Sequence, residues 1–287
     1  MSITTVLIRS AFSAALLVGA TAMASGSDYG ELRANSHDVQ ATQWPDNLAS
    51  LKVSFFADPH VGSAFTSQSD LDALVKSINR QKADVIIGGG DYIVAALYFK
   101  GETDFDIEDI ANSLAQLKAR DGVYFVLGNH DEVMSRDMAK FRTILGNSGI
   151  TVLENEAAVI ERSDGSQYCV AGVRDKSVGT TIDDITRTLN GVPENCPTLL
   201  VTHDPSLFKD ISKEQTSRIA FMMAGHTHCG QISAVAYAAN FFHKIPAKFH
   251  GGRFTHEGSE GIVTCGTGLS SVDYRDIPPQ YEVLKIR

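Results

Sequence analysis

The sequence predicts an α/β fold, arranged as a four-layer α/β/β/α sandwich of two mixed sheets. In the first half of the chain, short apolar runs alternate with segments whose apolar residues recur at helical spacing, which is typical of parallel strands covered on both faces. In the second half, a hairpin signal and further strands replace this rhythm, which indicates a second sheet. With 287 residues, of which 43% are hydrophobic, the chain is long enough for one large domain.

Residues 1–24 have the features of a secretory signal peptide. One positive charge, Arg9, precedes an apolar run over residues 11–20, and the small residues on either side of Met23 form a cleavage signature. The uncharged stretch 10–27 is slightly short for a membrane span. We therefore expect a cleaved peptide and an exported protein, either periplasmic or secreted. A protein anchored in the membrane by an uncleaved N-terminus is the alternative.

The first folded elements follow a polar stretch. Residues 25–50 are expected to be a linker or lead-in to a domain over residues 51–287. The first strand of this domain covers residues 51–56. A helix follows over residues 69–82, with a capping-box pattern at 69–72. One face of this helix carries its apolar residues, Leu71, Leu74, Val75 and Ile78.

Two further strand–helix pairs come next. A strand over residues 85–87 leads to a helix over residues 106–120, whose apolar face carries Ile107, Ile110, Leu114 and Leu117. A strand over residues 123–127 leads to a third helix, whose apolar face carries Met134, Met138, Phe141 and Leu145. Gly146 is the predicted C-terminal stop of that helix.

The second half begins with a predicted hairpin. Residues 157–162 and 168–173 flank Ser163-Asp164-Gly165-Ser166, in which Asp-Gly is typical of a tight turn. A helix is expected over residues 182–189. The remaining predicted strands cover residues 198–201, 219–223, 261–265 and 281–286.

Five short segments, most of them at the ends of predicted strands, carry metal-binding side chains. They are Asp58-Pro59-His60, Gly90-Asp91, Gly128-Asn129-His130-Asp131, His203 and Gly225-His226-Thr227-His228. The strand ends of an α/β sheet face a common crevice, and Asp, Asn and His together suit a pair of divalent metals. Paired metals of this kind hydrolyse phosphate esters.

These segments differ in how specific they are when taken singly. Asp58 and His60 are two residues apart, which would turn both to one side of a strand, but the same pattern is common in loops. Asp91 follows three glycines, which is typical of a plain turn, although a carboxylate there could bridge two cations. The histidines at 226 and 228, after an apolar strand, are the most specific signal.

In order and spacing, this set resembles the calcineurin-like metallophosphoesterase superfamily over nearly all of the expected mature chain. Residues 225–231, 265–268 and 278–282 resemble its exported or membrane-associated bacterial phosphodiesterases. The resemblance implies a metallophosphoesterase-like sandwich fold and hydrolysis of phosphoesters. Ala57, Pro59 and Cys229 depart from the usual pattern of the family, but no metal ligand is missing.

The resemblance also implies roles for individual residues. One metal would be bound by Asp58, His60, Asp91 and His228, and the other by Asp91, Asn129, His203 and His226. A hydroxide shared between the metals would attack phosphorus, and His130 would stabilise the transition state or protonate the leaving group. Asp204, the residue after His203, could orient a metal-binding histidine without itself binding the metal. The two divalent ions would be Mn, Fe, Zn or Co, because oxygen and imidazole donors admit all of these.

Four cysteines, Cys169, Cys196, Cys229 and Cys265, lie after the signal segment. An even number in an exported protein favours disulfides, but four cysteines allow three connectivities. We prefer the pairs Cys169–Cys196 and Cys229–Cys265. Because Cys229 directly follows His228, a thiolate metal ligand is the alternative.

Charge limits the substrate class. The chain has a net charge of −9, and without residues 1–24 it keeps 24 basic and 34 acidic residues. This sign disfavours extended nucleic acid and favours a small phosphoester derived from a lipid or a nucleotide, with no obligate protein partner. Arg253 and Arg275 could bind a phosphate or head group, with surface ion pairing as their alternative role. The apolar stretch 234–249 could form a lipid-facing lip or pack on the core.

The sequence therefore predicts a phosphodiesterase with a dinuclear metal centre. One alternative is a phosphomonoesterase on the same metals, which would prefer p-nitrophenyl phosphate to its bis ester. The other is a non-catalytic periplasmic protein that binds a metal or ligand on this fold. Such a protein would lack a metal ligand or His130, and the sequence retains all of them.

Overall fold

The computed structural model describes most of the chain after residue 30. The described ranges are 31–41, 43–46, 48–62, 66–94, 106–133, 135–230, 245–269, 275 and 277–287. The predicted signal peptide, Met134 and most of the apolar stretch 234–249 lie outside these ranges. Within them, no helix is both long enough and apolar enough to cross a membrane.

The first sheet has six strands, which are mostly parallel. In spatial order they are β1 (Arg33–Val39), β12 (Gln280–Ile286), β2 (Leu51–Phe56), β3 (Val85–Gly88), β4 (Val123–Phe125) and β5 (Ile150–Val152). β2 to β5 are parallel to one another, whereas β12 runs antiparallel to β2 and parallel to β1. The prediction of parallel strands in the first half of the chain is confirmed.

The second sheet also has six strands. In spatial order they are β10 (Gly252–His256), β11 (Ser259–Val263), β9 (Ile219–Ala224), β8 (Thr198–Val201), β7 (Gln167–Gly172) and β6 (Glu156–Glu161). β6 and β7 form the predicted hairpin, and β10 is antiparallel to β11 at the other edge. The four central strands, β11, β9, β8 and β7, are parallel.

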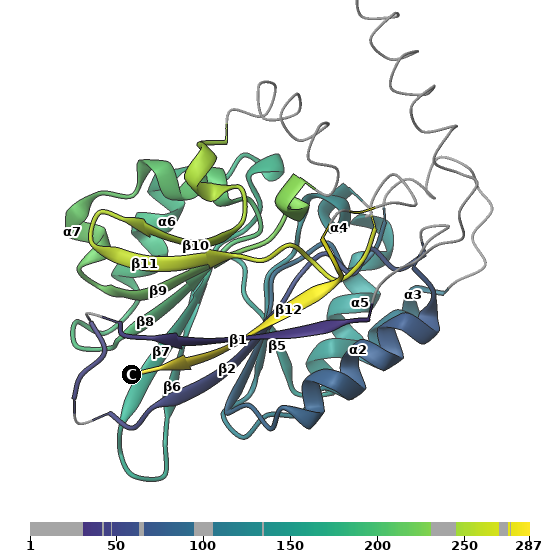
Figure 1. The fold of residues 1–287 in the computed structure, drawn as a ribbon, viewed down its shortest axis with the longest axis horizontal. Coiled ribbons are helices and arrows are strands. Elements are labelled where there is room, and N and C mark those ends of the chain that lie inside the picture. The colour runs from purple at the N-terminus through teal and green to yellow at the C-terminus, as the bar shows by residue number, and fades with distance from the viewer. Residues whose placement is uncertain are drawn as a thin grey trace, which may run out of the picture.

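Helices cover the outer face of each sheet, so the molecule has four layers (Figure 1). The first sheet is covered by α2 (Gln68–Arg80), α3 (Ile107–Leu114) and α5 (Ser135–Asn147). The second sheet is covered by α6 (Ile182–Asn190), α7 (Lys213–Thr216) and the 3-10 helices η3 (Pro205–Asp210) and η5 (Ala247–Phe249). The short elements α4 (Asn129–Val133), η2 (Lys176–Val178) and η4 (His228–Gly230) complete the fold. The predicted sandwich is confirmed.

Alternation along the strands divides the core between the layers. In β3, Val85 and Ile87 face the second sheet, whereas Ile86 faces the helices of the first. This is the period of two expected of a strand. Because both faces of β3 are buried, its sequence is a continuous hydrophobic run.

β1 lies inside the stretch that the sequence predicts to be a linker, residues 25–50. The prediction is wrong for residues 33–39, which pair in parallel with the whole of β12. β1 is an edge strand in which Val39 is buried and the other positions are exposed or half-buried. Its polar sequence therefore lacks the apolar alternation that would identify a strand.

Several element ends differ from the predicted ones. α2 is capped by Ser67 and Asp70, not by the pair at 69–72, because the Ser67 side chain accepts from the Asp70 N–H and the Asp70 carboxylate accepts in return. α3 ends at Leu114, six residues before the predicted end. Gly146 lies inside α5, which continues to Asn147. The short edge strands β5 and β10 were not predicted.

Candidate metal centre

The predicted donor residues meet at one end of the two sheets. Each follows a strand: Asp58 and His60 follow β2, Asp91 follows β3, Asn129 and His130 begin α4 after β4, His203 follows β8, and His226 and His228 follow β9. All of these strands are parallel within their sheets, so their carboxyl ends open to one side. The structure thus brings together side chains that lie up to 170 residues apart, from Asp58 to His228.

One group of donors consists of Asp58, His60 and His228, hereafter the Asp58 group. The Nε2 atoms of His60 and His228 are 3.0 Å apart. Oδ1 of Asp58 lies 3.8 Å from Nε2 of His60 and 3.6 Å from Nε2 of His228. The backbone N–H of His226 donates to both oxygens of Asp58, at 3.1 and 3.0 Å, which fixes the carboxylate.

A second group consists of Asp91, His203 and His226, hereafter the His203 group. Nε2 of His203 lies 3.0 Å from Oδ2 of Asp91 and 3.2 Å from Nδ1 of His226. The same Asp91 oxygen is 3.7 Å from Nε2 of His60 in the Asp58 group. The carboxylate of Asp91 thus belongs to the His203 group and also lies near the Asp58 group.

The donor set fits divalent metals. Two nitrogen ligands bound at about 2.1 Å and at a right angle to each other are about 3.0 Å apart, which matches the separation of the His60 and His228 nitrogens. The Oδ1 atom of Asn129 is buried and has no hydrogen-bond partner among the described residues, as expected of an oxygen that binds an ion. On the far side of its ring, His203 donates from Nδ1 to the Gly89 carbonyl at 2.7 Å, which directs Nε2 into the centre.

The loops that carry the donors have unusual backbone conformations. Five donor residues have a positive φ: Asp58 at 56°, His60 at 46°, Asp91 at 55°, His226 at 71° and His228 at 49°. Residues with a Cβ rarely adopt this backbone region, because it is sterically strained. The strain persists only where the surrounding structure imposes the conformation. Asp58 and His60 thus come together through a tight turn, not through the strand alternation that the sequence analysis assumed.

The glycines before Asp91 allow the loops to approach closely. Gly90 has a φ of 95°, and a Cβ atom there would lie 2.5 Å from the backbone nitrogen of Gly128 and 2.8 Å from Nδ1 of His203. A side chain would therefore push apart the loops after β3, β4 and β8. Glycine at this position thus permits the close approach of the three loops.

The sequence analysis assigned no role to Asp131, which the structure places beneath the centre. This buried carboxylate accepts hydrogen bonds from the backbone N–H groups of Asp91 (2.8 Å), Gly128 (2.9 Å), Tyr92 (3.0 Å) and Ile93 (3.2 Å). It therefore holds the loop that carries Asp91 against the loop that carries Asn129. Its place in the motif Gly-Asn-His-Asp was the only sequence signal that could have pointed to it.

Replacing Asp131 with asparagine should loosen this end of the fold. An amide can satisfy only some of the four N–H groups, and an unsatisfied buried donor costs about 1–3 kcal/mol. We expect the free energy of unfolding, measured by urea titration without added metal, to fall by at least about 2 kcal/mol. The matched control is Asp164→Asn, at an exposed turn where the carboxylate also accepts a backbone N–H. Equal stability of the two variants would contradict the role assigned to Asp131.

Burial controls the protonation of the Asp58 group. It lowers the pKa of His60 to about 3, lowers the pKa of His228 and raises the pKa of Asp58 to about 7. For His203 and Asp91, burial opposes the shifts, but their ion pair raises the pKa of His203 and lowers that of Asp91. A neutral imidazole can bind a metal directly, whereas His203 must first release a proton. Metal affinity should therefore fall as the pH falls.

Comparison with known proteins decides the family. The family model for the calcineurin-like phosphoesterase matches residues 51–230, which contain every predicted metal ligand. The chain belongs to the calcineurin-like phosphoesterase family. The clustered histidines and aspartates described above are thus candidate metal ligands of a phosphoesterase.

Three relatives illustrate the family. A transmembrane protein with a metallophosphoesterase domain from Danio rerio is 27% identical over 249 residues, which cover 83% of this chain and 53% of the relative. The uncharacterized metallophosphoesterase YkuE from Bacillus subtilis is 24% identical, over 90% of this chain and 89% of its own. The phosphodiesterase YaeI from Escherichia coli is 29% identical, over 65% and 64%. The chain spans about half the length of the Danio rerio relative.

Both arginines that were predicted to bind substrate contact other parts of the chain. Arg253 donates to the Asp38 carbonyl at 3.0 Å and forms an ion pair with Glu260, at the edge of the second sheet. Arg275 donates to backbone carbonyls beside the Asp58 loop. Substrate binding by either residue stays a prediction.

Asp204 accepts a hydrogen bond from the Ser206 N–H at 2.7 Å and caps η3.

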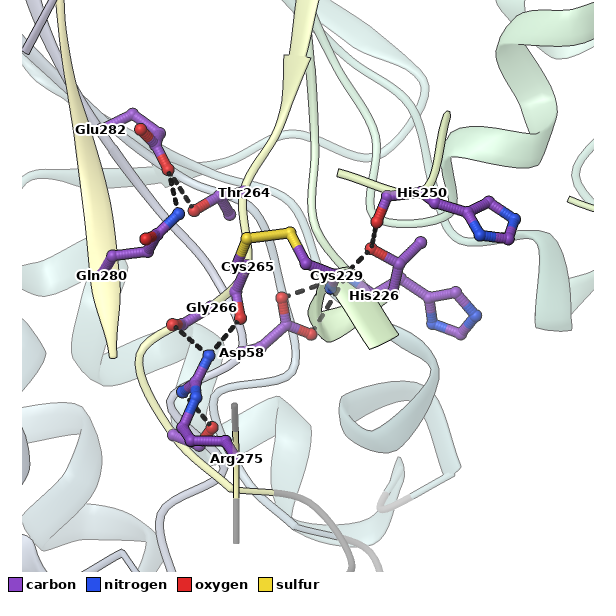
Figure 2. The surroundings of a disulfide bond; sticks show 12 residues. Asp58, His226, Cys229, His250, Thr264, Cys265, Gly266, Arg275, Gln280 and Glu282 are labelled. Atoms are coloured by element: carbon purple, nitrogen blue, oxygen red, sulfur yellow. Dashed lines mark hydrogen bonds between the residues drawn. A yellow bond between two sulfur atoms is a disulfide. The ribbon is translucent and has the colours of Figure 1, made fainter. Parts of the chain in front are cut away.

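Both preferred disulfides are present in the structure. Cys169 is bonded to Cys196, and Cys229 is bonded to Cys265. The alternative, in which Cys229 binds a metal as a thiolate, is therefore wrong, because its sulfur is already bonded to another sulfur. Figure 2 shows the second disulfide next to His226 and Asp58.

Proposed function

We propose that the protein is a phosphodiesterase that acts through two divalent ions, of Mn, Fe, Zn or Co, in this centre. The observation that carries the proposal is the position of Asp91, whose Oδ2 lies 3.0 Å from Nε2 of His203 and 3.7 Å from Nε2 of His60 in the Asp58 group. A single carboxylate shared between two sets of histidines suits two neighbouring cations. When bound, such ions activate water and neutralise charge on the phosphoryl oxygens.

His130 is the residue proposed to act on the substrate itself. Its ring packs edge-on against His60, with centroids 4.8 Å apart, and the residue is partly exposed. Its backbone N–H donates to Oδ1 of Asp91 at 2.8 Å, which fixes it to the centre. From this position the imidazole can stabilise charge on a phosphoryl oxygen or protonate the leaving oxygen.

The net charge and the similarity to a named phosphodiesterase support a small phosphodiester as the substrate. The net charge of −9 disfavours an extended polyanion, and the relative from Escherichia coli is named a phosphodiesterase. A phosphodiester derived from a lipid or a nucleotide fits both facts. Export from the cytoplasm, with removal of residues 1–24, is part of the proposal, and the two disulfides support an oxidising compartment.

A substrate comparison tests the proposal. The protein, stripped of metal with a chelator, is loaded in turn with Mn, Zn, Fe or Co. Hydrolysis of bis-p-nitrophenyl phosphate is then compared with hydrolysis of p-nitrophenyl phosphate, and bound metal is counted by elemental analysis. We expect two ions per chain and faster hydrolysis of the diester, because the proposed site takes a phosphate that carries two ester groups.

Each other outcome has a defined meaning. Faster hydrolysis of the monoester would replace the proposal with a phosphomonoesterase on the same residues. Two bound ions without hydrolysis of either ester would favour a non-catalytic binding protein. Binding of a single ion would contradict the sharing of Asp91 between two metals.

A further inference from the structure

The Cys229–Cys265 disulfide lies directly behind the Asp58 group. Cys229 is the residue after His228, and Cys265 stands two residues beyond the end of β11. The bond thus joins the loop after β9, which carries two histidine donors, to the loop after β11, which carries none. Figure 2 shows the disulfide between these loops, with Asp58 and Arg275 beside it.

The loop from His226 to Cys229 needs outside support to keep its shape. His226, His228 and Cys229 all have positive φ, and Cys229 has a φ of 51°. Successive left-handed residues with side chains are sparsely populated in an unconstrained chain. Thr227 helps to hold the loop, because its hydroxyl donates to the His250 carbonyl at 2.8 Å and accepts from the Cys229 N–H at 3.2 Å.

The loop on the other side of the disulfide is hydrogen-bonded to the Asp58 loop. The N–H of Thr267 donates to the Ala57 carbonyl at 3.1 Å, and the N–H of Gly268 donates to the Asp58 carbonyl at 2.8 Å. A side chain at Gly268 would overlap the Pro59 carbonyl, so the two loops are in direct contact. Movement of residues 265–268 would therefore move Asp58.

Arg275 donates hydrogen bonds to three backbone carbonyls of this loop. Its Nη2 atom donates to the carbonyls of Cys265 at 2.7 Å and Gly266 at 3.2 Å, and its Nη1 atom donates to that of Gly268 at 3.0 Å. A guanidinium can make these bonds together because its N–H groups form a rigid fork. Its positive charge also lies close enough to lower the pKa of Asp58 and that of His228, although burial has the larger effect on both.

β12 holds the same loop from the opposite side. The hydroxyl of Thr264 donates to the buried carboxylate of Glu282 at 2.8 Å, and the N–H of Gln280 donates to the Gly266 carbonyl at 3.0 Å. The loop is thus fixed to the first sheet by hydrogen bonds, and the disulfide extends that fixed point to the residue next to His228.

We infer that the Cys229–Cys265 disulfide and Arg275 are positioning elements of the metal centre, which hold His228 and Asp58 at the spacing required by one of its two ions. The inference rests on the proposed dinuclear site. It predicts a local effect: loss of the disulfide weakens binding of the ion held by the Asp58 group and leaves the His203 group competent.

The other disulfide provides a matched control. Cys169–Cys196 joins β7 to the loop before β8 and packs with Val192, away from the donor residues. Its sequence separation of 27 is close to the 36 of Cys229–Cys265, so the two bonds should constrain the unfolded chain to a similar degree. A difference between them in metal binding therefore cannot come from general stability.

The experiment compares two double variants of the full chain, Cys229→Ala/Cys265→Ala and Cys169→Ala/Cys196→Ala. Each is loaded with Mn and titrated with a chelator, and the ions retained are counted by elemental analysis. The wild-type protein and the Cys169→Ala/Cys196→Ala variant should retain two ions. The Cys229→Ala/Cys265→Ala variant should retain one ion under the same conditions, with the affinity for the other lowered about 10–100-fold. Thermal unfolding, measured with and without Mn, should show a smaller metal-induced shift in that variant alone.

A third variant, Arg275→Lys, keeps both disulfides and a positive charge. Because a lysine has one nitrogen in place of the two guanidinium nitrogens that bond these carbonyls, the variant should lose the same ion as Cys229→Ala/Cys265→Ala. If circular dichroism shows that the double variant does not fold, ion retention by Arg275→Lys tests the inference instead. Retention of both ions with wild-type affinity in the folded variants would overturn the inference. Failure of the wild-type protein to bind two ions would instead overturn the proposed function.

Discussion

Replacing Asp91 with alanine will abolish phosphodiester hydrolysis and release bound metal. The carboxylate lies within reach of His60 on one side and His203 on the other, so its loss removes a ligand from both proposed ions. Removal of a single group that stabilises a transition state costs about 10²–10³ in rate, and we expect a larger loss here. The rate is measured with bis-p-nitrophenyl phosphate in excess Mn, and the metal content by elemental analysis after dialysis.

The control for this variant is a carboxylate at the opposite end of the first sheet. Asp121 accepts from Nε of Arg162 at 3.1 Å and from the Tyr168 hydroxyl at 3.2 Å, and it follows α3 far from the donors. Asp121→Asn should lower the melting temperature and leave metal content and turnover unchanged. Normal hydrolysis by Asp91→Ala would refute the bridging assignment and, with it, the observation on which the proposed function depends.

Replacing His130 with alanine will preserve both metals and slow the reaction. The side chain is not among the residues that the resemblance makes ligands, and proton transfer by a positioned group contributes about 10²–10⁴ in rate. We therefore expect turnover to fall by about that factor, with two ions still bound. Elemental analysis of the purified variant separates this result from the loss of metal expected of Asp91→Ala.

Leaving groups of different basicity distinguish the two roles open to His130. If the imidazole protonates the leaving oxygen, the variant should lose more rate with a phenyl ester than with a p-nitrophenyl ester, because p-nitrophenolate leaves without a proton. If it stabilises a phosphoryl oxygen, both esters should be slowed equally. A fall in bound metal would show instead that His130 is a ligand, because one of its ring nitrogens lies within 4.8 Å of donor atoms of His60 and Asp91.

Most of the predicted donor segments lie directly after a hydrophobic strand, and the resemblance to the metallophosphoesterase superfamily singled out the expected ligands within them. Parallel strands expose their carboxyl ends on one side of a sheet, so separate segments such as Gly90-Asp91 and His203 could be expected to meet. The residues do meet, within 3.0 Å for Asp91 and His203. Metal-binding side chains at a strand end can thus be recognised from the sequence, provided that the strand itself is apolar.

What the sequence could not reveal depends on contacts between distant segments. The polar strand β1 is defined by its pairing with β12, about 245 residues away, and not by its own pattern. The four backbone N–H groups that donate to Asp131 belong to two loops, which meet only in the folded protein. The turn at Asp58 and His60 requires left-handed backbone at both residues, which is imposed by neighbours that no local pattern describes.

The pairing of β1 with β12 sets where the domain can be cut. The two strands are side by side near the middle of Figure 1, one purple and the other yellow, and the family match starts only at Leu51. A fragment that began at that residue would expose one whole edge of β12, including its backbone N–H and C=O groups. Bare edges of this kind recruit strands from other molecules. Recombinant work on this protein should therefore keep Arg33–Val39, or poor solubility will be mistaken for a property of the whole protein.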